Sequence, residues 1–231
     1  MTVSGADALT FLQGQLTNDL SELGNGPPML AAWCNPKGRV ICLFRVSAYD
    51  EGYRMALPTE LVESVEKRLT MFRFRSKVDF ERGEATATDL GATGTIPDWR
   101  VANLRAGIPD IRVAQSEAFT PHMLNLDLLG AISFDKGCYT GQEIVARTHY
   151  RGATKRRMFR FESEQPVAEG AEVRDGERKI GDVVNVIGND LLAVIPVDSR
   201  DAGLSVDGTT LRRTALPYES KQIPVRSSST R

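Results

Sequence analysis

Cysteine is scarce in this chain. Three occur among 231 residues, Cys34, Cys42 and Cys138, and no two of them form a Cys-x-x-Cys pair. An odd count without that spacing excludes a disulfide framework, a structural zinc site and a self-contained four-cysteine cluster. We therefore predict no metal site. Because a chain without a disulfide framework is typical of reducing compartments, we expect a cytoplasmic protein.

Long apolar runs and an excess of one charge are also lacking. No apolar run approaches the ~20 residues that a membrane span requires, and the first residues, Met-Thr-Val-Ser-Gly-Ala-Asp, lack the features of a secretory signal. The formal net charge is −1, so no global field attracts nucleic acid and any anion site must be local. The hydrophobic share of 41% and the charged share of 26% are ordinary for a globular chain.

The first part of the chain alternates helix and strand patterns. The residues Ser4 to Leu16 are predicted to form a helix with Ser4 as its N-cap, because leucines recur at helical spacing. The residues Leu30 to Ser47 are typical of a β-hairpin with a type I turn at 35–38. This turn places Cys42 opposite Ala31, so we expect no Cys34–Cys42 disulfide.

A strand at 53–57, a helix that Pro58 opens at its first position, and a further strand are predicted next. The run from Phe72 to Val78 alternates aromatic and basic residues. Such a run is compatible with nucleic-acid binding, but we favour an ordinary strand with a solvated charged face. Strand, strand, helix and strand together predict a ferredoxin-like α+β unit.

The second half changes character. Residues 86–112 carry little pattern, and a second helix is predicted to begin at Phe119-Thr120-Pro121 and to end at Gly130. From Lys155 onward the pattern is all β, with strand-like runs at 158–161, 183–187 and 191–197 separated by Asp-Gly and Gly-Asn turn signals. This predicts a small β-barrel of about 65 residues, and residues 227–231 are expected to fray.

The stretch from Ser133 to Arg151 concentrates reactive and charged side chains around two glycines. Cys138 lies near Lys136 and just before an expected helix start near Gly141, and both features favour a thiolate. A structural interpretation is also open. Residues 140–143, Thr-Gly-Gln-Glu, have the form of a capping box, and Cys138 would then be a small buried hydrophobe.

The run at 136–143, Lys-Gly-Cys-Tyr-Thr-Gly-Gln-Glu, resembles the signature of the YgfZ family, which belongs to the superfamily of the folate-binding glycine cleavage T protein. Residues 11–19 and the Cys-Asn-Pro-Lys-Gly-Arg run at 34–39 resemble further motifs of this family. Relatives carry a strand before the first helix. Because Met1 lies almost at the motif, we expect that this strand is missing or the start truncated.

The resemblance implies an α+β fold with two ferredoxin-like α+β lobes around a central channel and a small C-terminal β-barrel. Residues 1–153 would form the folate-binding region, with the boundary between its lobes near 80–100. Residues 154–223 would form the barrel and residues 224–231 a tail.

The function implied is a tetrahydrofolate-binding accessory protein that assembles or maintains iron–sulfur clusters in client enzymes, including radical enzymes that modify tRNA. Cys138 would be its key thiol. Tetrahydrofolate or a derivative would be held by residues of the signature, of the opening motif and of the hairpin turn. The residues expected to bind it are Asn18, Asp19, Lys37, Arg39, Lys136, Gly137, Tyr139, Gln142, Glu143 and Arg147.

Two departures separate this chain from the aminomethyltransferase itself. That enzyme carries a catalytic acidic pair after its hairpin, whereas residues 38–49 contain no Asp or Glu. The transferase also carries a pterin-anchoring Glu where this chain has Arg105. An aminomethyltransferase and a non-enzymatic scaffold with a vestigial folate site remain alternatives. Direct tRNA binding is a weaker one, based on Arg147, Arg151, Lys155, Arg156 and Arg157.

Overall fold

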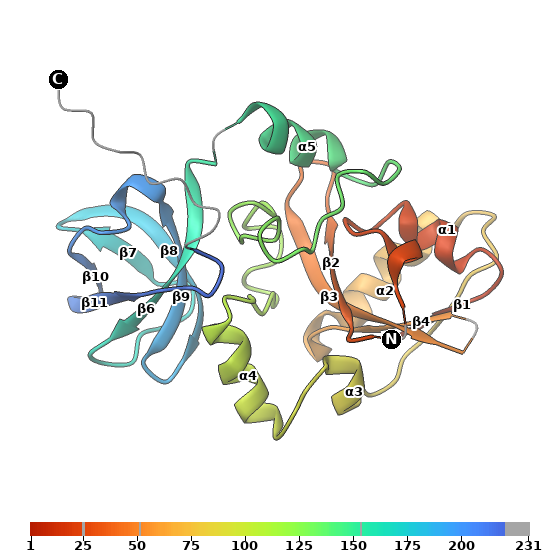
Figure 1. Cartoon of the computed structure of the whole chain (residues 1–231), viewed down its shortest axis with the longest axis horizontal. Helices are drawn as coiled ribbons and strands as arrows, with labels where there is room; N and C mark the ends of the chain where they lie inside the picture. The colour runs from red at the N-terminus through yellow and green to blue at the C-terminus, as the bar shows by residue number, and fades with distance from the viewer. Residues whose placement is uncertain (25, 51, 153, 220–231) are drawn as a thin grey trace.

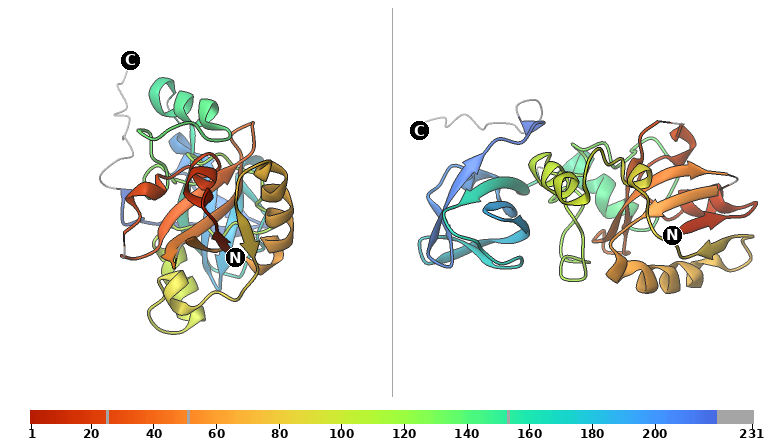
Figure 2. Two further views of the ribbon diagram at one scale, coloured as in Figure 1. Left: turned by 90° about the vertical axis from the view of Figure 1, so that its right-hand side faces the viewer. Right: turned by 90° about the horizontal axis from the view of Figure 1, so that it is seen from below.

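The computed structural model describes residues 1–24, 26–50, 52–152 and 154–219. A β-sheet with its helices and a closed β-barrel lie at opposite ends, and a segment of helices and turns lies between them (Figures 1 and 2). The expected mixed architecture with a C-terminal barrel is confirmed. In the part expected to form the second α+β lobe, the described residues between 82 and 155 include helices and turns and no strand.

The N-terminal sheet is antiparallel, with the strand order β2-β3-β4-β1-β5. Its strands are β1 (Thr2–Ser4), β2 (Met29–Cys34), β3 (Val40–Tyr49), β4 (Gly52–Ala56) and β5 (Asp79–Glu81), and its helices are α1 (Ala8–Gln13) and α2 (Thr59–Arg73). A short 3₁₀ helix, η1 (Leu20–Glu22), follows α1. Leu12, Leu16 and Leu69 are fully buried in one hydrophobic cluster with the sheet residue Phe44.

The start of the chain differs from the prediction in two ways. A strand does precede the first helix, because Ser4 pairs with Asp79 of β5 in place of capping a helix. Helix α1 therefore begins only at Ala8, with Asp7 as its N-cap, and ends at Gln13. Pro58 likewise is the N-cap of α2 and not its first residue.

The hairpin of β2 and β3 is confirmed, but its predicted register is wrong. Cys34 lies opposite Val40, and a register shift between Trp33 and Cys34 then places Cys42 opposite Trp33. A bulge of this kind cannot be read from turn length alone. Cys34 and Cys42 are both free and buried, as expected.

The run at 72–78 is not a strand. Helix α2 continues to Arg73, and Phe74 then takes a left-handed backbone conformation with φ of 45°. The chain forms a loop until β5 begins at Asp79. The preferred interpretation of this run, a strand with a charged face, is therefore wrong.

The central segment contains two helices that the sequence pattern did not indicate, α3 (Ala87–Leu90) and α4 (Ile96–Arg105). Each begins at a threonine cap, Thr86 and Thr95. The helix expected from Phe119 is instead a series of turns. Asn125 interrupts it with a φ of 57°, and its buried amide donates a 2.7 Å hydrogen bond to the backbone of Met158.

Helix α5 (Gln142–Arg151) leads into the barrel, whose closed order is β10-β11-β6-β9-β8-β7. Its strands are β6 (Arg156–Ser163), β7 (Glu172–Asp175), β8 (Arg178–Ile187), β9 (Asp190–Pro196), β10 (Leu204–Val206) and β11 (Thr209–Thr214), with a 3₁₀ helix, η2 (Val197–Ser199), after β9. The three predicted strand runs lie in β6, β8 and β9, except that Val197 begins η2. The predicted tail at 224–231 lies outside the described residues. In the part of the chain described, no helix is long and apolar enough to cross a membrane.

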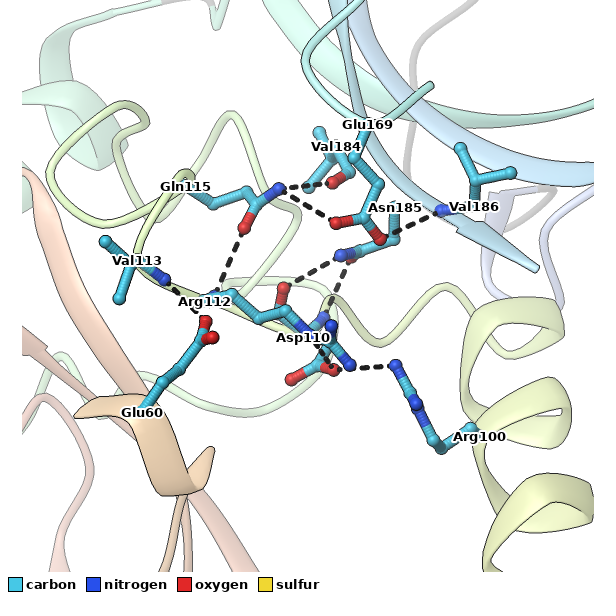
Figure 3. Close-up of polar contacts among 10 residues, drawn as sticks. All are labelled: Glu60, Arg100, Asp110, Arg112, Val113, Gln115, Glu169, Val184, Asn185 and Val186. Carbon is cyan, nitrogen blue, oxygen red and sulfur yellow. Dashed lines mark hydrogen bonds and ion pairs between the residues drawn. The ribbon is translucent and has the colours of Figure 1, made fainter. Parts of the chain in front are cut away.

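A polar seam fixes the barrel against the rest of the chain (Figure 3). The side chain of Asn185 accepts a 2.9 Å bond from the backbone of Asp110 and donates a 2.8 Å bond to it. Gln115 donates at 2.9 Å to a backbone carbonyl of β8, and Glu60 of α2 accepts from Val113. These hydrogen bonds connect the central segment to the barrel at Asn185 and Val184 and to α2 at Glu60.

Candidate functional site

The signature packs directly against the hairpin turn through two glycines. Gly141 is the N-cap of α5 with φ of 82°, and a Cβ built on it would lie 2.5 Å from the carbonyl oxygen of Asn35. A Cβ on Gly38 would lie 2.8 Å from the Cβ of Ile144. Only glycine permits this approach and this backbone conformation together. Two motifs that are distant in the sequence therefore meet in the fold.

The three protons of the Lys136 ammonium are all used inside the protein. They are donated to the side-chain oxygen of Gln13 at 2.8 Å and to the carbonyl oxygens of Leu16 at 2.8 Å and Asn18 at 2.7 Å. Burial lowers the pKa of Lys136 to about 8, and the Asp19 carboxylate opposes this shift. Lys136 thus ties the signature loop to the end of α1. The sequence alone predicts a different role for this cation, which is to favour the thiolate of Cys138.

The three cysteines differ sharply in access. Cys138 is exposed, whereas Cys34 and Cys42 are buried. Burial raises the pKa of the Cys34 thiol to about 12 and raises the pKa of Cys42 further. A thiolate is the reactive form of cysteine. Cys138 is therefore the accessible thiol, and it is not the buried hydrophobe of the structural interpretation.

The capping box at Thr140 does not form. Gly141 is the N-cap of α5, no side chain caps this helix, and Glu143 is exposed. Gln142 accepts a 3.3 Å bond from the backbone N–H of Tyr139 and so closes the turn before the helix. The ring of Tyr139 is buried, its pKa is raised by that burial, and the Lys136 ammonium lies 5.5 Å from the ring centroid.

The residues of the opening motif are engaged within the fold. The amide of Asn18 is buried and donates 2.8 Å bonds to the carbonyl oxygens of Leu30 and Gly130. Asp19 accepts bonds from Gln13 at 2.6 Å and from Ser21, and the Ser21 bond is the main cause that lowers its pKa. The Asn18 side chain thus joins β2 to the central segment, and the backbone carbonyl oxygen of Asn18 accepts from the Lys136 ammonium of the signature.

A carboxylate that sequence reasoning missed reaches the hairpin turn. Glu117 accepts a 2.5 Å hydrogen bond from the amide of Asn35 and a 2.7 Å hydrogen bond from Arg68. Its backbone has a φ of 62°. The Asn35 bond, followed by the Arg68 bond, lowers the pKa of Glu117. Both oxygens of the Glu117 carboxylate accept hydrogen bonds, and its lowered pKa favours the ionised form. The group is therefore poorly suited to donate a proton. No local pattern marks Glu117, because its partners lie far away in the sequence.

The remaining cations of the site are available at the surface. The cations Lys37 and Arg147 are exposed, and among the described residues neither forms an ion pair. Gly137 of the signature is also exposed. Arg39 donates one bond to the carbonyl oxygen of Ala118. Arg105 pairs with Asp190 of the barrel at 3.1 Å. Lys37 and Arg147 therefore have the charge that an anionic ligand group requires, whereas Arg105 is used within the fold.

Comparison with known proteins adds the family. The model of the "CAF17, C-terminal beta-barrel domain" matches residues 155–217. A protein of Haemophilus influenzae described as uncharacterized is 32% identical and aligns over 81% of each chain. The protein of Klebsiella pneumoniae named "tRNA-modifying protein YgfZ" is 31% identical over 84% of this chain and 77% of its own.

A solved structure shares the fold. The glycine cleavage system aminomethyltransferase T of Bartonella henselae superposes with a TM-score of 0.69, covering 94% of this chain and 82% of that one, at 15% identity. At this identity the likeness concerns the fold alone. The relatives above 30% identity and the signature at 136–143 show that the chain belongs to the YgfZ family.

Proposed function

We propose that this chain is an accessory protein in tRNA modification, which binds a tetrahydrofolate and supports iron–sulfur clusters of client enzymes through Cys138. The relatives named "tRNA-modifying protein YgfZ" support the tRNA role. The single observation that carries the thiol role is the exposure of Cys138 in a loop fixed at both sides. Lys136 anchors the loop on one side, and the contact of Gly141 with the hairpin anchors it on the other.

The folate part rests on charge and position. Lys37 of the hairpin turn and Arg147 of α5 belong to the two segments that Gly141 brings together, and both are exposed. Each cation would contribute ~1.5–3 kcal/mol to a partly buried carboxylate contact. A folate bound there would supply a one-carbon carrier beside Cys138. We propose residues 1–153 as the folate-binding region and residues 154–223 as the barrel domain.

Aminomethyl transfer of the glycine-cleavage type is the disfavoured alternative. Residues 38–49 lack Asp and Glu, and the one carboxylate found at the turn, Glu117, is held ionised by Asn35 and Arg68. We expect no turnover with tetrahydrofolate and the aminomethyl-lipoyl carrier. Turnover at rates typical of that enzyme would overturn this part of the proposal.

Calorimetric titration with tetrahydrofolate tests the cofactor, and complementation tests the thiol. We expect Lys37→Gln and Arg147→Gln to weaken folate binding about tenfold each. The Cys138→Ala protein should bind folate like the parent. It should also fail to restore tRNA thiolation in a host that lacks its own family member, while Cys42→Ala restores it. If a well-folded Cys138→Ala protein functions normally, the thiol role is wrong and the scaffold alternative is favoured.

A further inference from the structure

The loop that follows α2 carries an aromatic side chain in an unusual position. Phe74 is 88% exposed, and its backbone has φ of 45° and ψ of −109°. A bulky residue in that region is strained by ~1–3 kcal/mol, and such residues cluster at functional sites. An exposed phenyl ring also gains nothing from burial. Two unfavourable features therefore coincide at one residue that no element of the fold requires to be aromatic.

The residues after Phe74 are basic and free. Arg75 and Lys77 are exposed, and in the described part of the chain neither has an ion-pair partner. Arg73, by contrast, donates to the carbonyl oxygen of Val78 and lies 3.9 Å from Asp79. The segment 71–77, Met-Phe-Arg-Phe-Arg-Ser-Lys, holds no acidic residue.

A hollow adjoins this loop. A shallow depression of about 750 Å³, wide open to solvent, is lined by Phe74, Arg75 and Ser76 and by Asp7 and Thr10 of the α1 region. None of these residues belongs to the signature. Asp7 is itself engaged, because its carboxylate accepts a 2.7 Å bond from the backbone of Lys77.

We infer that Phe74, Arg75 and Lys77 form a contact surface for single-stranded RNA. One base stacks on the Phe74 ring, and backbone phosphates on either side of it lie against the Arg75 guanidinium and the Lys77 ammonium. Proteins bind unpaired nucleic acid by this combination of an exposed aromatic platform and flanking cations. The surface shares no residue with the signature and needs no folate. It rests on the tRNA part of the proposed function and names the residues that would contact the RNA.

The basic cluster at 147–157 is the competing surface, and the structure weakens it. Arg157 forms a bidentate pair with Asp127 at 3.0 and 2.8 Å. Arg156 donates to the carbonyl oxygens of Ile180 and Val194 within the barrel. Two of the five cations are thus committed to the fold, whereas Arg75 and Lys77 project from a loop.

Fluorescence anisotropy with a labelled single-stranded oligouridine RNA tests the inference at several salt concentrations. We expect Phe74→Ala to weaken binding about tenfold and Phe74→Trp to retain it, since stacking is the contribution removed. Arg75→Gln and Lys77→Gln should each reduce the slope of log affinity against log salt by about one. The matched control is Met71→Ala, because Met71 is 63% exposed in the last turn of α2 and lacks a stacking face.

A glycine variant separates recognition from folding. Phe74→Gly relieves the backbone strain, so it should raise the melting temperature while RNA binding falls as in Phe74→Ala. A purely structural Phe74 would lower both. Undiminished binding by Phe74→Ala, or binding that instead depends on Arg147 and Arg151, overturns the proposal. The proposal is also overturned if Phe74→Ala binds RNA like the parent but no longer binds a protein partner, because the surface would then belong to that partner. Cys138→Ala should bind RNA like the parent, so failure of the thiol proposal is distinguishable.

Discussion

Gly141 of the signature meets Gly38 of the hairpin turn backbone to backbone, since a Cβ on Gly141 would lie only 3.2 Å from the α-carbon of Gly38. This contact brings the loop that carries Cys138 against the turn that carries Lys37. Because both glycines have positive φ, neither position accepts another residue without strain. The geometry of the candidate site therefore depends on two residues that carry no functional group.

Replacing Gly141 by alanine should destabilise the protein. The left-handed backbone alone costs about 1–3 kcal/mol, and the new Cβ would meet the carbonyl oxygen of Asn35 at 2.5 Å. Urea denaturation measures the change in the free energy of unfolding. Gly137→Ala is the matched control in the same loop, since a Cβ there would meet nothing within 4 Å. Equal effects of the two substitutions would contradict the proposed docking.

Lys136→Met should destabilise the loop by about 2 kcal/mol, because three charge-assisted hydrogen bonds are lost and two buried carbonyl groups are left unpaired. Lys37→Met should change the free energy of unfolding by less than about 0.5 kcal/mol, since Lys37 is exposed. Amide hydrogen exchange of residues 136–141 offers a second measure, with faster exchange in Lys136→Met. Unchanged exchange would show that the ammonium does not hold the loop.

Alkylation at neutral pH should label Cys138 first. The other two thiols are buried and hold their protons, so they should react only when the protein opens. Brief treatment with iodoacetamide followed by peptide mass spectrometry gives the order. Adding urea above the unfolding midpoint should make all three react at similar rates. Labelling of Cys34 or Cys42 before Cys138 in the folded protein would be incompatible with this structure.

Alkaline pH should reduce the stability that Cys34 contributes. Its pKa is raised from 9.0 to about 12 in the folded state, so the folded protein keeps the thiol proton after the unfolded chain has lost it. The contribution is therefore complete below pH 9 and falls as the pH rises toward 12, by at most about 1.4 kcal/mol per pH unit. Urea titrations under reducing conditions should show the parent losing stability relative to Cys34→Ala between pH 8 and 10. A constant difference would mean that the thiol is solvated.

The sequence by itself determined the features that depend on neighbouring residues. The turn at 35–38, the helix starting near Gly141 and the main barrel strands follow from turn residues, glycine positions and alternation. The signature at 136–143 identified the family. Cys34 and Cys42 are free, as the sequence predicts, although the hairpin register on which that prediction was based is wrong.

Only the tertiary structure decided how these pieces meet. The bulge that sets Cys42 opposite Trp33, the ammonium of Lys136 on a carbonyl 118 positions earlier, and the Glu117 carboxylate on Asn35 across 82 positions have no local signal. Nor does the strained Phe74, whose run alternates like a strand but ends a helix. Turns and caps are stabilised by contacts within a few residues, so a short sequence segment is enough to predict them. Long-range contacts are selected by the packing of whole segments, and the same residues would make different ones in another fold.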